Sequence, residues 1–303
     1  MRATGVITTA RGTRTEAFGA TEWGLLAAIA AMWGSSYLLI AVGLEAFPPT
    51  LIALLRLAFG AVAVGAFRRA RRPIDREDLP RVALLGVIWM AVPLLLFPIG
   101  QDLGIASSVA GMINGAMPLF AALFAWILLA RAPAARQGVG LALGFAGVVL
   151  ILLPSLQGAA ATAVGAALLI LAVTLYGLSA NITVPLQQKY GALPVVFRAQ
   201  LVALVLLAPL GLAFGLPRAS FALDALAAMV ALGVFGSGLA FIAMATLVGR
   251  AGATRGAVAI YFVPVVALAL GVTILGERPA PISLAGVALV LLGAYLTSRR
   301  EAR

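Results

Sequence analysis

The chain has 303 residues with a net charge of +11, of which 63% are hydrophobic and only 10% charged, and its mean hydropathy is +1.11. This composition excludes a soluble domain, and because the arginines lie in short loops between apolar runs, their charge predicts contact with anionic lipid rather than with nucleic acid. The absence of histidine and cysteine excludes imidazole bases, thiolate nucleophiles and the commonest metal ligands, so we expect no metal, no cofactor and no enzymatic activity.

Long apolar runs follow one another along the chain and predict an all-α integral membrane protein with ten transmembrane helices. Residues 1–21 contain arginines but no apolar core, so we expect a cytoplasmic N-terminal tail rather than a signal peptide. Residues 299–303 form a basic C-terminus. The expected spans, bounded by proline, glycine and arginine, are 22–44, 49–67, 80–101, 105–129, 137–154, 162–184, 193–214, 222–247, 253–275 and 281–298.

The basic residues predict the orientation of these spans. With the N-terminus inside, all of the 21 basic residues except Arg56, Arg218 and Arg278 fall on the cytoplasmic side. This is the distribution that the positive-inside rule requires. We therefore expect a multi-pass protein of the bacterial inner membrane, with both termini in the cytoplasm and with a monomer favoured.

An internal duplication relates the two halves of the chain. Residues 106–150 align without gaps on 252–296, and the two repeats are expected to cover 22–154 and 161–298. Each repeat holds five helices, an odd number, so the second must be inverted in the membrane relative to the first, as in many transporters. The proline and glycine positions that the two copies share are Pro118 and Pro264, Gly140 and Gly286, and Gly147 and Gly293.

Two short segments carry a family resemblance. The run Met32 to Tyr37, reading MWGSSY and followed by Pro49 and Arg56, resembles the opening of an EamA-type repeat. The run Leu275 to Arg278, reading LGER, resembles part of its closing helix pair, although the first repeat has Ala130-Arg131 where the second has glycine and glutamate. The chain thus resembles the ten-helix EamA branch of the drug/metabolite transporter superfamily, to which amino-acid exporters of the YddG type belong. The resemblance implies a secondary transporter that exports small metabolites, with amino acids favoured.

Polar and aromatic side chains within the spans are candidates to line a cavity between the repeats. A buried hydroxyl or amide needs a partner, which can be a solute or a neighbouring helix, so interhelical bonding and packing remain the alternative. Pro118 and Pro264 are expected to bend their helices and expose backbone groups. The candidates for substrate binding are Trp33, Ser36, Tyr37, Trp89, Gln101, Asn114, Tyr176, Ser179, Asn181 and Tyr261.

Arg56 lies about two turns into its span, where a charge is costly. It could bind a carboxylate of the substrate, but we favour a structural or gating ion pair with Glu45 or Asp102. Asp102 is expected at the outer mouth, where it could equally meet an ammonium group.

The acidic residues bear on the mode of transport. All ten fall in loops or near helix ends, and none is placed at mid-membrane, where a proton-coupled carrier buries a carboxylate. The sequence therefore predicts facilitated rather than proton-coupled transport by alternating access. Export of drugs or other metabolites is the alternative, and a channel or a lipid scramblase is less favoured.

Overall fold

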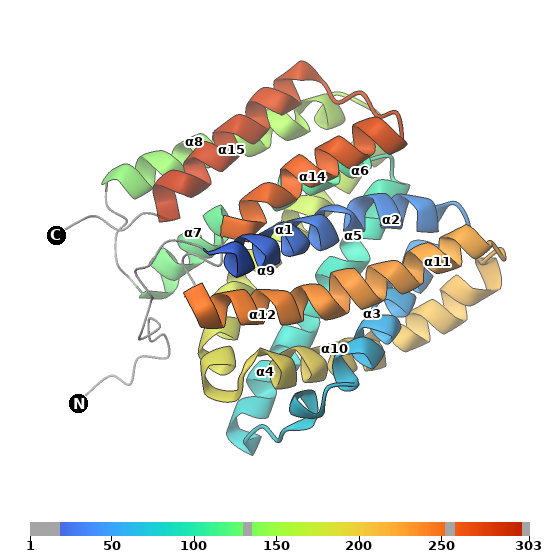
Figure 1. The fold of residues 1–303 in the computed structure, drawn as a ribbon. Coiled ribbons are helices and arrows are strands. Elements are labelled where there is room, and N and C mark those ends of the chain that lie inside the picture. Colours follow the sequence, from blue (N-terminus) through green and yellow to red (C-terminus); the bar gives the residue numbers. More distant parts are fainter. Residues whose placement is uncertain (1–18, 130–134, 252–257, 299–303) are drawn as a thin grey trace.

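The computed structural model describes residues 19–129, 135–251 and 258–298, and this part of the chain contains helices and no strand (Figure 1). Residues 1–18 of the expected N-terminal tail, the basic C-terminus and Ala130-Arg131 lie outside the described residues. The helices are α1 (Ala20–Gly34), α2 (Ser36–Leu44), α3 (Pro49–Gly65), α4 (Leu79–Leu85), α5 (Val92–Asp102), α6 (Ser107–Asn114), α7 (Met117–Leu129), α8 (Ala135–Leu156), α9 (Ala160–Tyr190), α10 (Ala192–Leu210), α11 (Leu223–Ala231), α12 (Ala240–Ala251), α14 (Val258–Ile274) and α15 (Pro281–Ser298).

Within these residues, seven helical segments are long and apolar enough to cross a membrane. Three shorter apolar helices, α3, α14 and α15, pack with them in the bundle. A backbone in lipid must satisfy its own hydrogen bonds, which a helix does within one segment. The all-α membrane class that the composition predicts is therefore confirmed.

Several helices change geometry along their length. A π-helical segment, η3 (Gly86–Ala91), joins α4 to α5, and a second, η6 (Leu232–Leu239), joins α11 to α12. The helix expected over 105–129 is interrupted between α6 and α7, just before Pro118. A proline ring clashes with the preceding turn of a helix, and its nitrogen cannot donate a backbone hydrogen bond. By contrast, α14 continues through Pro264 without interruption.

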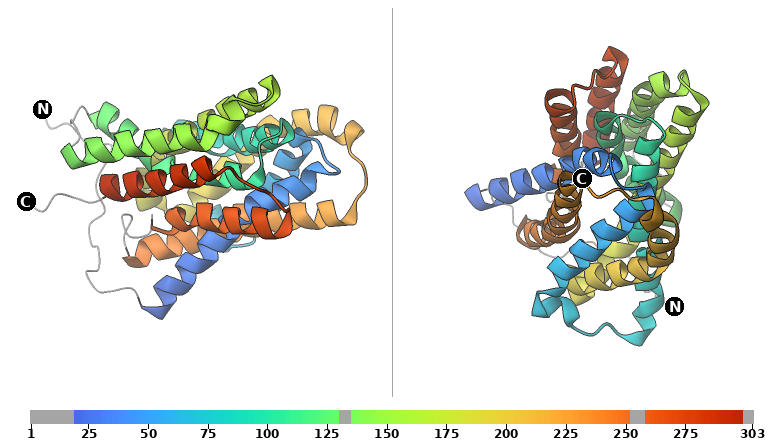
Figure 2. Two further views of the ribbon diagram at one scale, coloured as in Figure 1. Left: turned by 90° about the horizontal axis from the view of Figure 1, so that it is seen from above. Right: turned by 90° about the vertical axis from the view of Figure 1, so that its right-hand side faces the viewer.

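The bundle has two ends. The start of α1 and the end of α15 lie at one of them, the termini end, and the end of α2 and the start of α11 lie at the other, the far end (Figures 1 and 2). Small residues allow the helices between them to pack closely. A Cβ atom on Gly147 of α8 would lie 2.5 Å from the carbonyl oxygen of Gly286 in α15, and one on Gly293 would meet the carbonyl oxygen of Gly140. The two helices are thus antiparallel and in backbone contact, as small residues permit in membrane bundles.

A charged cluster ties the segments together at the termini end. The Lys189 ammonium, in the last turn of α9, lies 2.9 Å from the Asp75 carboxylate and 2.8 Å from that of Asp78. The Tyr190 hydroxyl donates to Asp78 over 2.7 Å. The segment between α3 and α4 is thereby attached to the end of α9.

Candidate functional site

The centre of the candidate site is the guanidinium of Arg56, on the buried face of α3. Its side chain is only 7% exposed, and its Nε donates a 2.7 Å hydrogen bond to the hydroxyl of Ser237 in η6. Tyr37 and Tyr176 lie near the guanidinium. Its two terminal nitrogens make no hydrogen bond to the residues that the structure describes. A buried guanidinium with free donors suits a carboxylate ligand, which it can bind through two parallel bonds.

Aromatic rings from three helices form a contact cluster near the arginine. Phe97 of α5 stacks on Tyr176 of α9 with ring centroids 6.0 Å apart, and meets Tyr37 of α2 edge-on at 5.4 Å. The Tyr37 ring packs against α6 at Gly111, and the amide carbonyl oxygen of Asn114, at the end of α6, is buried without a partner among the described residues. The cluster therefore combines a cation, two hydroxyls and an amide with rings, the mixture that fixes a small polar solute.

A second aromatic group adjoins the first. Phe241 of α12 packs edge-on against Trp33 at 5.5 Å and against Trp89 at 5.1 Å. The Trp33 indole donates to the carbonyl oxygen of Gly236 over 3.1 Å, and the neighbouring Ser36 hydroxyl donates to the carbonyl oxygen of Met32, in the last turn of α1. These side chains connect α1 and η3 to the helix that holds Ser237.

Three further residues of the expected binding set also bond to backbone. Ser179 donates to the carbonyl of Tyr176, Asn181 donates across to α7 at the carbonyl of Ala121, and Tyr261 donates to α15. In this conformation they join helices or helical turns, which is the alternative that the sequence left open. Their contact with a solute stays a prediction.

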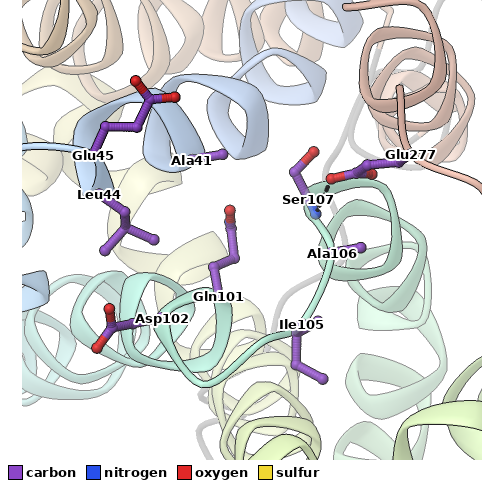
Figure 3. A pocket seen from close by; sticks show the side chains of 9 residues that line it. All are labelled: Ala41, Leu44, Glu45, Gln101, Asp102, Ile105, Ala106, Ser107 and Glu277. Carbon is purple, nitrogen blue, oxygen red and sulfur yellow. Dashed lines mark hydrogen bonds between the residues drawn. The ribbon is translucent and has the colours of Figure 1, made fainter. Parts of the chain in front are cut away.

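A pocket of about 340 Å³ opens at the far end of the bundle (Figure 3). The Glu277 carboxylate on one side of it accepts hydrogen bonds of 2.7 and 2.8 Å from the backbone N–H groups of Ser107 and Ser108, at the start of α6. Asp102 lies at this pocket rather than against Arg56, so the expected ion pair between them is not formed in this conformation. The pocket is lined by Ala41, Leu44, Glu45, Gln101, Asp102, Ile105, Ala106, Ser107 and Glu277.

The sequence did not single out Ser237, Phe97, Phe241 or a structural role for Glu277. Ser237 lies in the glycine-rich run 232–239, a signal of close packing but not of a partner for an arginine. Glu277 belongs to the LGER run, which marks the family but not the helix that the glutamate caps. Among the described residues, no group of three or more histidine, cysteine or acidic side chains could hold a metal ion.

The described residues thus form a helical bundle of a multi-pass membrane protein, with a buried cationic and aromatic cluster inside it. The model of the EamA-like transporter family matches residues 22–153 and again 163–299. The chain belongs to this family, and so to the EamA-type branch of the drug/metabolite transporter superfamily.

Individual relatives support this placement. The chain is 30% identical over 281 residues to a probable terminal-alkyne amino-acid exporter of Streptantibioticus cattleyicolor, covering 92% of this chain and 93% of that protein. It is 28% identical over 292 residues to the uncharacterized inner membrane transporter YedA of Escherichia coli, covering 90% and 92%. A solved crystal structure has the same fold, with a TM-score of 0.62 at 18% identity over 91% of this chain and 96% of that one.

Proposed function

We propose that the protein is a secondary transporter that exports small metabolites, with amino acids as the favoured substrates. The observation that carries this proposal is Arg56, a buried guanidinium with two nitrogens unbonded to the described residues. An α-carboxylate would satisfy both nitrogens, while Tyr37 and Tyr176 offer hydroxyls and ring faces to the rest of the solute. The name of the Streptantibioticus relative, an amino-acid exporter, points to the same class of solute.

Alternating access requires two halves that can exchange roles, and we propose ten spanning helices in two inverted repeats. The contacts of α8 with α15 support this arrangement. Gly147 faces Gly286, and Gly140 faces Gly293. The alignment shift of 146 residues converts Gly140 into Gly286 and Gly147 into Gly293, since 286 − 140 and 293 − 147 both equal 146. If the two repeats exchange places, the Gly147–Gly286 contact therefore becomes the Gly293–Gly140 contact. A two-fold axis between antiparallel helices requires this relation.

A second pair of contacts is related by a similar shift between the repeats, and it relates Arg56 to a residue of the second repeat. A Cβ atom on Gly233 would lie 2.8 Å from the carbonyl oxygen of Arg56, and one on Gly86 would lie 3.0 Å from that of Ala199. The corresponding shifts are similar, 233 − 86 = 147 and 199 − 56 = 143. The arginine of the first repeat thus corresponds to an alanine in the second, which leaves one cation for one carboxylate.

We further propose that transport is facilitated rather than proton-coupled, in the bacterial inner membrane, with both termini cytoplasmic. The described carboxylates support this: they lie in the termini-end cluster or its segment before α4, at the far-end pocket, or in the first turns of α1 and α11, away from mid-span. Eighteen of the 21 basic residues fall on the side assigned to the cytoplasm, since only Arg56, Arg218 and Arg278 do not.

Counterflow of labelled amino acids in proteoliposomes tests the proposal. We expect saturable exchange without a pH gradient. We also expect Arg56→Met to lower the affinity about 10- to 100-fold, because a charged hydrogen bond contributes about 1.5–3 kcal/mol. Arg56→Lys should restore little of it, since an ammonium lacks the planar fork. Arg218→Gln, which removes an exposed arginine bonded to its own helix, is the matched control.

Two outcomes contradict the proposal. Exchange that is unchanged in Arg56→Met excludes the arginine as the carboxylate site. Failure of every amino acid, with uptake of an apolar cation such as ethidium, supports the multidrug alternative, and a single-channel current supports a channel.

A further inference from the structure

The far-end pocket contains an unusual buried amide. Gln101, in the last turn of α5, is only 8% exposed, yet neither its Nε2 nor its Oε1 has a hydrogen-bond partner among the described residues. The Ser107 hydroxyl across the pocket is 3% exposed and is also unpartnered. Figure 3 shows the Gln101 side chain extending into the space between Ala41 and Ser107. Leaving buried polar atoms unpaired costs about 1–3 kcal/mol per group, so this arrangement is suited to a ligand that pairs them.

The charge of the pocket determines which ligand fits. Three of its nine lining residues are carboxylates and none is basic. The Glu277 carboxylate is already used by the two N–H groups of α6, whereas Glu45 and Asp102 are exposed at the rim and make no ion pair with a described residue. Two free carboxylates beside an unpaired amide and hydroxyl favour a cation that carries several hydrogen-bond donors.

The pocket adjoins the Arg56 cluster along two helices. Ala41 lies one turn beyond Tyr37 on α2, and Gln101 lies one turn beyond Phe97 on α5, so each pair shares a helix face. The edge contact between Tyr37 and Phe97 separates the two regions. The pocket therefore lies between the Arg56 cluster and the far end of the bundle.

We propose that the far-end pocket is a second binding site, a vestibule that takes the ammonium group of a solute with a small apolar side chain. This inference rests on the proposed function and names the chemistry that its substrate must carry. Glu45 and Asp102 attract the ammonium, and Gln101 and Ser107 bond to it or to its neighbouring polar group. Leu44 and Ile105 contact the apolar part. A volume of about 340 Å³, at the lower end of ligand pockets, suits one amino-acid-sized molecule.

Equilibrium binding to the full chain in nanodiscs tests the vestibule apart from the arginine site. The probe is leucine methyl ester, which keeps the ammonium but lacks the carboxylate that Arg56 would bind. We expect the double variant Glu45→Gln/Asp102→Asn to bind the ester about 3- to 20-fold more weakly. Asp224→Asn, which removes an exposed carboxylate at the same end but outside the pocket, should bind it normally.

Gln101→Leu separates a binding role from a packing role. A packing role predicts a less stable protein with unchanged binding, whereas our inference predicts the reverse. The apolar replacement removes two unpaired buried atoms, so the empty protein should be at least as stable by thermal unfolding, while ester binding falls about tenfold.

The outcomes distinguish the vestibule from the proposed transport. N-acetyl-leucine, which lacks the ammonium, should not compete with the ester, and competition as strong as that of leucine overturns the vestibule. Ester binding that is unchanged in both the double variant and Gln101→Leu also overturns it, even if amino acids are transported through Arg56. If amino-acid exchange fails but the ester binds and the variants lose it, the vestibule stands and the proposed substrate is wrong.

Discussion

Glu277 connects the two family-matched halves, and its neutralisation gives a measurable loss of stability. The first four N–H groups of a helix lack partners within it, and the Glu277 carboxylate accepts from two of them in α6, at 2.7 and 2.8 Å. A hydrogen bond to a charged group contributes about 1.5–3 kcal/mol. Because this carboxylate is only half-buried, we take the lower value for each bond, about 3 kcal/mol for the pair.

Glu277→Gln keeps one neutral acceptor, worth about 1 kcal/mol, and turns an amide N–H toward the second donor. We therefore expect the free energy of unfolding to fall by about 2 kcal/mol. Glu277→Asp keeps the charge beside the helix but is one methylene shorter, so its loss should be smaller.

Unfolding by increasing mole fractions of SDS in mixed micelles, followed by tryptophan fluorescence, measures these differences. Arg278→Gln is the matched control, because it removes an exposed charge from the adjacent residue. A Glu277→Gln protein within about 0.5 kcal/mol of wild type, or equal to its control, would refute the reasoning.

Three further predictions concern packing, pH and the arginine. Gly147→Leu should lower the free energy of unfolding, measured in SDS, by about 1–3 kcal/mol or prevent folding, because even a Cβ there would lie 2.5 Å from a carbonyl oxygen of α15. Gly138→Leu is the control and should be tolerated, because the space around Gly138 is open. The hydrogen bond from Lys189 holds the pKa of Asp75 below its ordinary value. The stabilisation that Asp75→Asn removes should therefore be fully present above about pH 4 and lost as the pH falls through the lowered pKa; a difference that does not shrink at all as the pH falls below about 4 contradicts this. Ser237→Ala should raise the half-saturating amino-acid concentration in counterflow less than the loss of the guanidinium does, because Ser237 only positions it; an equal effect would mean that the hydroxyl binds the solute directly.

Several features of the fold follow from local sequence. The apolar runs identify the membrane class, because a segment of that composition and length has no other place to satisfy both its side chains and its backbone. Pro118 and Pro264 predict bends in their helices. The structure separates α6 from α7 just before Pro118, whereas α14 runs without interruption through Pro264, and the two bends stay a prediction. Local sequence does not specify how neighbouring helices support a proline.

The partners within the candidate site depend on the tertiary structure. The sequence identifies Arg56, Tyr37, Gln101 and Asn114 as polar groups in apolar surroundings, since this requires only hydropathy. It does not show that Arg56 bonds to a serine 181 positions away, or that Glu277 caps a helix 170 positions before it. Hydropathy is a property of one segment, whereas a hydrogen bond depends on which faces of distant helices meet. Only the packed bundle therefore decides that Arg56 keeps free donors and that Gln101 faces an acidic pocket without a partner.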